Sequence, residues 1–151
     1  MVRIRNAHED DVDTIVNFQM AMAEETENIA LNEKSVRQGV QNVIHDVQKG
    51  RYYLAQDGNI VAGSLLITRE WSDWRNLWVL WIQSVYVLPR YRGKGIFKQL
   101  YNHIKQMALE NNEVAGIRLY VDKSNVNAIK VYEKLGMDGE HYKVFEWMKQ
   151  L

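Results

Sequence analysis

Val85-Tyr86-Val87-Leu88-Pro89-Arg90-Tyr91-Arg92-Gly93-Lys94-Gly95-Ile96 joins an apolar strand to a helical pattern through a turn that contains two glycines and the only proline of the chain. Glycine lets the backbone turn tightly and approach a ligand closely, and the start of a helix presents free N–H groups and the positive end of its dipole. Arg92 and Lys94 place positive charge beside the glycines. The stretch therefore predicts an anion-binding turn, and a pyrophosphate group is the expected ligand.

Length and charge limit what surrounds this turn. With 151 residues, the chain is expected to form a single domain over residues 1–151 with a hydrophobic core of its own. Its 19 basic and 19 acidic residues cancel, so no overall field favours nucleic acid or an anionic membrane as a partner. Neither a signal peptide nor a run of transmembrane length is recognised, and a cytoplasmic location is expected.

Residue types that support thiol or metal chemistry are scarce. The chain has no cysteine, which excludes a disulfide framework, a thiolate nucleophile and a cysteine metal site. Its four histidines are scattered without the spacing of metal ligands, so no metal is expected.

Hydrophobic periodicity around the turn predicts alternating strands and helices. Strands are expected at Val2–Arg5, Tyr52–Gln56, Ile60–Thr68, Leu77–Val87, Ile117–Val121 and His141–Lys149. Helices are expected at Asp11–Glu25, Asn32–Gln48, Ile96–Glu110 and Asn125–Leu135. This order predicts the α/β (α+β) class with a mixed sheet.

The strand over residues 77–87 is apolar on both faces, which is typical of a strand in the middle of a sheet. Strict alternation places Tyr86 on the face of Leu80 and Ile82, and Val85 on the other face with Trp81.

Two common phosphate-binding loops do not match the glycine turn. A P-loop requires Gly-Lys-Ser/Thr at its end, but Gly95 is followed by Ile96. A Rossmann turn requires a third glycine three residues after the second, and that position is Lys98.

Arg90-x-x-Gly93-x-Gly95, between a strand and a helix, resembles the acetyl-CoA loop of the GNAT N-acetyltransferase superfamily. The segment Asn125–Met137 resembles the downstream motif of the same family, Asn-x-x-Ala followed by Tyr-Glu-Lys-x-Gly-Phe, with Met137 in place of the phenylalanine. The opening Ile4-Arg5-x-Ala7 is also similar, so the resemblance covers nearly the whole chain. It implies a mixed, strongly twisted central sheet with helices on both faces, whose central parallel strands, 77–87 and 117–121, splay apart to admit the pantetheine arm.

The resemblance also implies residue roles toward acetyl-CoA as co-substrate. The backbone of Val85–Val87, Tyr86 included, would pair with the pantetheine amides, Asn125 would contact the cofactor arm, and Tyr132 would protonate the leaving thiolate. Backbone N–H groups at the turn would bind the pyrophosphate: Arg92, Gly93, Lys94, Gly95, Ile96 and Phe97. Two of these residues also have purely structural interpretations, since Asn125 suits a helix N-cap and Tyr132 suits a core position.

The implied reaction is direct attack of a neutral amine on the thioester, without a covalent enzyme intermediate. Some family members carry a glutamate on the strand before the loop as general base, but residues 77–87 contain no carboxylate. The base is therefore expected to be a water held by Gln83 or Ser84, or a carboxylate from elsewhere. The carboxylates considered are Glu70 and Asp73, in an expected loop, and Glu24, Glu25 and Glu27, near the end of the first helix.

The acceptor is expected to be the amine of a small cationic molecule. Glu24, Glu25 and Glu27 supply negative charge, and Trp71 and Trp74 flank Asp73 where aromatic rings can hold a cation. A solvated helix end and buried packing are the alternative interpretations of these residues. Acetylation of a protein amine and a non-catalytic acyl-CoA sensor remain as other functions, and both a monomer and a homodimer remain open.

Overall fold

The computed structural model describes residues 1–150. The chain separates into two compact units, Met1–Arg118 and Leu119–Leu151. Among the described residues, the first unit contains all five strands and the second contains a single α-helix, α4 (Val126–Lys134). The mixed sheet and the four α-helices confirm the predicted fold class.

The sheet of the first unit has the strand order β1-β2-β3-β4-β5. Its strands are β1 (Val2–Asn6), β2 (Arg51–Asp57), β3 (Ile60–Ser72), β4 (Leu77–Val87) and β5 (Val114–Arg118). Strands β1 to β4 pair antiparallel, and β4 pairs parallel with β5. Since β4 lies between β3 and β5, its prediction as an inner strand is confirmed.

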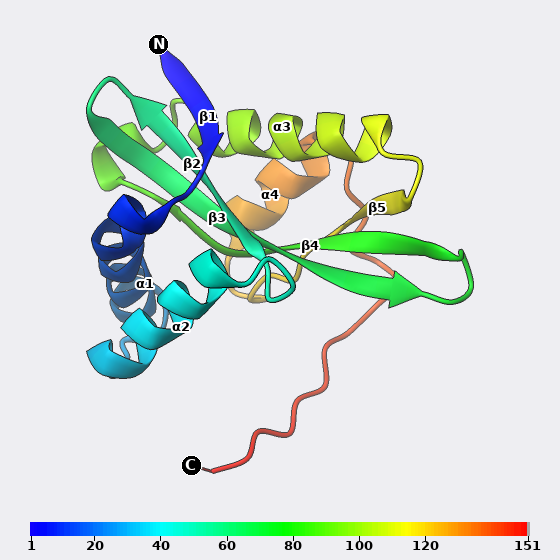
Figure 1. Ribbon diagram of the computed structural model, residues 1–151. Coiled ribbons are helices and arrows are strands. Elements are labelled where there is room, and N and C mark those ends of the chain that lie inside the picture. Colours follow the sequence, from blue (N-terminus) through cyan, green and yellow to red (C-terminus); the bar gives the residue numbers. More distant parts are fainter. Residues whose placement is uncertain (151) are drawn as a thin grey trace. The chain divides into compact units, whose positions relative to one another are not determined.

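Helices cover both faces of this sheet. The helices of the first unit are α1 (Val12–Glu27), α2 (Glu33–His45) and α3 (Ile96–Glu110), with short 3₁₀ turns at Glu9–Asp11 and Pro89–Tyr91. Tyr52 and Leu54 pack in one cluster with Ile15 of α1 and Val40 of α2. Tyr53, which points to the opposite face, contacts His103 of α3 at 5.6 Å between ring centroids. Figure 1 shows α1 and α2 on one side of the sheet and α3 on the other.

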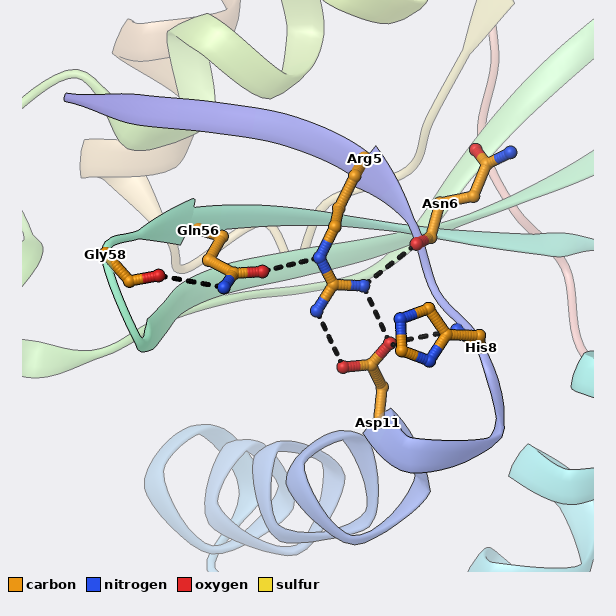
Figure 2. Close-up of polar contacts among 6 residues, drawn as sticks. All are labelled: Arg5, Asn6, His8, Asp11, Gln56 and Gly58. Carbon is orange, nitrogen blue, oxygen red and sulfur yellow. Dashed lines mark hydrogen bonds and ion pairs between the residues drawn. The ribbon is translucent and has the colours of Figure 1, made fainter.

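A buried ion pair joins the edge strand to the start of α1. Arg5 on β1 donates two hydrogen bonds to Asp11, both of 2.8 Å, and a third of 2.5 Å to Gln56 on β2. The Asp11 side chain is only 7% exposed and also accepts from the His8 backbone N–H at 2.9 Å. Figure 2 shows these groups converging at the point where β1 leads into the first helix. The network fixes where α1 begins relative to β1 and β2.

An irregularity near the end of β4 overturns one prediction. The register of β3 and β4 shifts between Ser64 and Leu66, and Ser84 on β4 has a φ of 52°. One extra residue in a strand turns every later side chain to the opposite face. Strict alternation predicted that Tyr86 shares the face of Ile82, and this prediction was wrong. Tyr86 lies opposite Ser64 and packs against Phe18 of α1 at 5.0 Å between ring centroids.

Several predicted element boundaries were wrong by a few residues. Strand β3 continues to Ser72, and α2 ends at His45, where Asp46 takes an extended conformation. The strand predicted at 117–121 lies instead at Val114–Arg118, because Trp78–Trp81 of β4 supplies its hydrogen-bonding partner there. Gly116 is accommodated inside that strand, although glycine is usually depleted in strands.

The last predicted strand, His141–Lys149, is irregular in the structure. Its large apolar side chains are more than half exposed: Tyr142 78%, Val144 56%, Phe145 92%, Trp147 86% and Met148 77%. A segment rich in apolar residues forms a strand only where a neighbouring strand supplies hydrogen bonds. The local sequence pattern could not show whether such a neighbouring strand is present.

Candidate active site

The glycine turn takes the conformation that the sequence predicts. Gly93 and Gly95 have φ values of 75° and 79°, in the left-handed region that favours glycine. Gly95 is the N-cap of α3, and in the described part of the chain no side chain caps the helix there. Apart from its chain neighbours, a Cβ atom at either glycine would meet no atom of residues 1–150 within 4 Å. Conformation, not crowding, therefore requires glycine, and the helix start remains open to an anion.

A tyrosine in the turn anchors it to a neighbouring hairpin. The Tyr91 hydroxyl donates to Asp57, at the end of β2, over 2.9 Å, and this hydrogen bond raises the pKa of Tyr91. The Tyr91 ring has Arg90 and Lys94 near it, at 5.6 and 5.7 Å from its centroid. The sequence did not indicate this anchor, because its partners lie 34 residues apart. The anchor holds two cationic side chains beside the glycines.

Gly63 on β3 permits close packing behind the turn. A Cβ atom there would lie 2.8 Å from the Tyr86 carbonyl oxygen and 3.2 Å from the Ile96 side chain. Real Cβ atoms do not approach backbone this closely, so a larger residue would push β3, β4 and the start of α3 apart. Gly63 thus positions the end of β4 against the first residue of α3.

The strand before the turn has a backbone edge that β5 does not cover. Pairing between β4 and β5 ends at Trp81 and Arg118, whereas β4 continues to Val87. The segment 82–87, which includes Gln83 and the predicted pantetheine-pairing residues, extends beyond that pairing. An extended chain can add to such an edge by backbone hydrogen bonds. The Gln83 side chain itself donates to the Thr68 hydroxyl at 2.9 Å.

One of the predicted acceptor-site carboxylates lies directly at the turn. Glu25, in the last turn of α1, accepts from the Tyr86 hydroxyl at 3.1 Å and from Arg92 at 2.7 Å. Burial and the neighbouring Glu25 carboxylate raise the pKa of Tyr86. Glu24 and Glu27 are exposed on the same helix end. The structure thus brings Glu25, Tyr86 and Arg92 together from three elements.

The tryptophans predicted for the acceptor site lie elsewhere in the first unit. Strands β3 and β4 extend past the other strands as a hairpin (Figure 1), and Asp73 and Trp74 lie at its tip. Trp74 is 91% exposed, while Trp71 packs edge-on against Trp78 across the hairpin at 4.9 Å. Since the tip is the end of β4 opposite Val87, the structure does not bring these residues together with Glu25.

Glu70 lies in β3, not in a loop as predicted. Its carboxylate accepts from the Trp81 indole at 3.1 Å and from Arg118 at 2.7 Å. These donors stabilise the charged form and lower the pKa of Glu70. A carboxylate with a lowered pKa is a weak base, so this group is a cross-strand link and a poor candidate for proton removal.

The second unit carries the other predicted motif. The Asn125 side chain accepts from the Ala128 backbone N–H at 3.1 Å, so it caps α4, as one of the two interpretations proposed. Tyr132 lies on α4, and burial raises the pKa of its hydroxyl. The hydroxyl therefore stays protonated at neutral pH, as a proton donor must.

The lengths of the helices and the positions of the acidic and histidine side chains bear on membrane and metal binding. None of the helices in the described part of the chain is long and apolar enough to cross a membrane. Residues 1–150 also contain no group of three or more His, Asp or Glu side chains arranged to hold a metal ion.

Comparison with known proteins identifies the family. The model of the acetyltransferase (GNAT) family matches residues 12–137, and the chain therefore belongs to this family. A crystal structure of a possible acetyltransferase from Clostridium difficile 630 has a TM-score of 0.92 and 41% sequence identity, over 100% of this chain and 99% of that chain.

Two curated relatives carry more specific names. The thialysine N-epsilon-acetyltransferase of Mus musculus is 33% identical over 81 residues, which cover 52% of this chain and 45% of that protein. The spermine/spermidine N(1)-acetyltransferase of Bacillus subtilis (strain 168) is 22% identical over 114 residues, covering 72% of this chain and 75% of the relative. The match thus spans about half the length of the mouse protein.

Proposed function

We propose that the protein is an N-acetyltransferase that moves an acetyl group from acetyl-CoA to a primary amine of a small cationic molecule. The observation that carries the proposal is the start of α3 behind two glycines of positive φ, directly after a strand that continues beyond its pairing with β5. Family membership gives this geometry its chemical meaning.

The residues at the turn fit a pyrophosphate group. Open space in front of Gly93 and Gly95, backbone N–H groups at the helix start and the side chains of Arg92 and Lys94 all favour an anion. Val85–Val87 supplies backbone groups for the pantetheine arm, and the resemblance assigns Asn125 to the same arm. Acetyl-CoA, when bound, supplies the thioester that is cleaved.

In the proposed reaction, the neutral amine nitrogen forms a bond to the acetyl carbon as the carbon–sulfur bond breaks. Tyr132 donates its proton to the departing thiolate, and the amine proton leaves through a base. We assign that base to a water held by Gln83, whose side chain Thr68 keeps in place. The reaction uses two substrates held together, and the protein contributes their alignment.

The acceptor class is supported by charge and by the two relatives. Both relatives are named for amine nitrogens of small cationic molecules, thialysine and spermine or spermidine. Glu24, Glu25 and Glu27 concentrate negative charge at the end of α1, which favours a cationic acceptor. A second surface that could attract a cation lies on the protruding hairpin and consists of Trp71, Asp73 and Trp74.

The first experiment measures release of free CoA thiol from acetyl-CoA with a panel of amines that includes spermidine, thialysine, an aminoglycoside and a short peptide. The chain contains no cysteine, so a thiol reagent reports CoA without a protein background. We expect saturable release with cationic small molecules. Release with the peptide alone would favour acetylation of a protein amine instead.

Substitution of Tyr132 separates catalysis from sensing. In the proposed enzyme, Tyr132→Phe reduces turnover by about 10²-fold or more and leaves CoA affinity unchanged. A non-catalytic acyl-CoA sensor would release no thiol with any amine and would be indifferent to the substitution. Loss of CoA affinity in this variant would contradict the proton-donor role.

A further inference from the structure

The side chain of Arg92 connects three groups that belong to different parts of the proposed site. Its Nε donates to the Val87 carbonyl at 2.9 Å, and its Nη2 donates to Glu25 Oε2 at 2.7 Å. The guanidinium also lies 5.4 Å from the centroid of the Tyr86 ring. Arg92 thereby holds the glycine turn against the end of β4 and the last turn of α1.

Glu25 is fully engaged in this arrangement. One carboxylate oxygen accepts from Arg92 and the other accepts from the Tyr86 hydroxyl at 3.1 Å. Tyr86 is 6% exposed, whereas the side chains of Arg92 and Glu25 are 48% and 40% exposed. The phenol is thus a fixed point, and the half-exposed ion pair is the weaker contact, open to exchange.

The groups that Arg92 occupies are those that the proposed function assigns to acetyl-CoA. The Val87 backbone is expected to pair with a pantetheine amide, and the guanidinium lies in the turn expected to bind pyrophosphate. A doubly charged pyrophosphate attracts a guanidinium more strongly than one half-exposed carboxylate does. Binding of acetyl-CoA would therefore compete for both hydrogen bonds of Arg92.

We propose that Glu25 couples the two substrates: it binds Arg92 until acetyl-CoA takes over that guanidinium, and it then binds an ammonium group of the acceptor other than the amine that is acetylated. Before the exchange, Arg92 neutralises Glu25, so a cationic acceptor gains little there. After the exchange, the carboxylate keeps its hydrogen bond from Tyr86 and regains an uncompensated charge. This inference rests on the proposed function and adds to it the residue through which the two substrates affect each other's binding.

The coupling has a signature that a merely structural residue would not give. Glu25→Gln removes the competing charge, so CoA should bind about 2- to 5-fold more tightly, as expected for loss of a half-exposed ion pair. Acetyl transfer to a cationic amine should fall in the same variant. Glu27→Gln is the matched control for the contact with Arg92, because it removes the same charge from the same helix turn, and no hydrogen bond or ion pair to Arg92 is found for Glu27 within residues 1–150. Its own contribution to attracting the acceptor is lost with and without CoA alike, so the comparison uses the effect of CoA and not the basal activity.

Calorimetric titration with CoA tests the first half of the inference. Tighter binding to Glu25→Gln, with Glu27→Gln close to the unmodified protein, supports it. Weaker binding to Glu25→Gln, or equal tightening in both variants, overturns it. Circular dichroism and melting temperature confirm that both variants are folded. If the unmodified protein binds no CoA, the proposed function itself fails, which is a different result.

Titration with spermidine, with and without saturating CoA, tests the second half. We expect CoA to strengthen spermidine binding by about 5-fold or more in the unmodified protein, since coupling between two sites is reciprocal. The strengthening should disappear in Glu25→Gln and persist in Glu27→Gln. Spermidine binding that ignores CoA in the unmodified protein, or coupling that survives in Glu25→Gln, overturns the inference.

Discussion

At the scale of single residues, the glycines of the first unit serve two different purposes. Gly63 is required by crowding, since a Cβ atom would lie 2.8 Å from the Tyr86 carbonyl oxygen. Gly95 is required by its φ of 79°, with open space around it. The distinction matters for mutagenesis, because only the second kind affects ligand binding without disturbing the core.

We therefore expect Gly95→Ala to fold with a stability loss of about 1–2 kcal/mol, the cost of a left-handed non-glycine residue. Its affinity for CoA should fall by about 10-fold, because relief of the strain reorients the N–H groups at the helix start. Gly58→Ala, at a hairpin turn with a φ of 60° and open space, is the control with equal strain. Calorimetry should show normal CoA affinity for the control. Equal affinity losses in both variants would contradict the assignment of the turn.

The raised pKa of Tyr132 leaves the pH dependence of the proposed reaction to the amine. Since burial raises this pKa above its ordinary value of 10.0, the hydroxyl stays protonated throughout the neutral and mildly alkaline range. The amine, in contrast, loses its proton as the pH rises. We expect kcat/KM to increase from pH 7 to about 9 without a falling limb from Tyr132. A falling limb in that range that vanishes in Tyr132→Phe would contradict this expectation.

At the scale of elements, the Arg5–Asp11 pair fixes the junction of β1 and α1. Burial opposes the charged form of Asp11, but hydrogen bonds from Arg5 and the His8 N–H outweigh it and lower the pKa of Asp11 below its ordinary value of 3.8. A carboxyl whose pKa is lower in the folded state contributes stability above its unfolded pKa. That contribution is lost as the pH falls through the folded value.

Asp11→Asn should consequently destabilise the protein by about 3 kcal/mol at pH 7, since it leaves a mostly buried arginine without its partner. The difference between the variant and the unmodified protein should begin to shrink below about pH 4, where Asp11 becomes protonated in the unfolded state, and should disappear as the pH falls through the lower folded pKa. Urea unfolding at pH 7, 5 and 3.5 measures both quantities. Asp13→Asn, on the exposed surface of α1, should change stability by less than about 1 kcal/mol.

The sequence predicted some of the helices and strands correctly and others wrongly. The bounds of β4 and α3 were predicted correctly, because strong periodicity and the glycine turn mark both. The face of Tyr86 was predicted wrongly, because a bulge at Ser84 leaves no mark in the hydrophobic pattern. The strand predicted at 141–149 is irregular in the structure, because its local sequence pattern does not supply a pairing partner.

The sequence likewise predicted one part of the candidate site and missed another. The backbone part of the turn follows from its glycines, whose conformational freedom is a local property. The contacts of Tyr91 with Asp57 and of Arg92 with Glu25 join residues 34 and 67 positions apart. Such long-range pairs depend on the packing of α1 and the β2–β3 hairpin. Local sequence pattern therefore indicated the ligand class but not the side chains that hold the turn in place.

At the scale of the whole molecule, binding of CoA should appear as thermal stability. A ligand at about 100 times its Kd stabilises the folded state by about 2.7 kcal/mol, which corresponds to a rise in Tm of about 5–10 °C for a chain of this size. Adenosine, which lacks the pyrophosphate, should produce almost no shift at the same concentration. An equal shift with both compounds would mean that the glycine turn is not the site of binding.

The bulge on β4 has a further consequence for insertions and deletions. Replacing Ser84 by glycine keeps the number of residues and suits the φ of 52°, so the protein should be unchanged or slightly more stable. Deleting Ser84 would remove the extra residue and restore a regular strand, in which Tyr86 still lies opposite Ser64, on the face of Phe18 and Glu25. Both variants should therefore keep the contacts of Tyr86, and thermal unfolding and CoA titration of the two measure whether they do. In this strand, the pairing of Tyr86 with Ser64, and not unbroken alternation from Ile82, sets the face of the phenol.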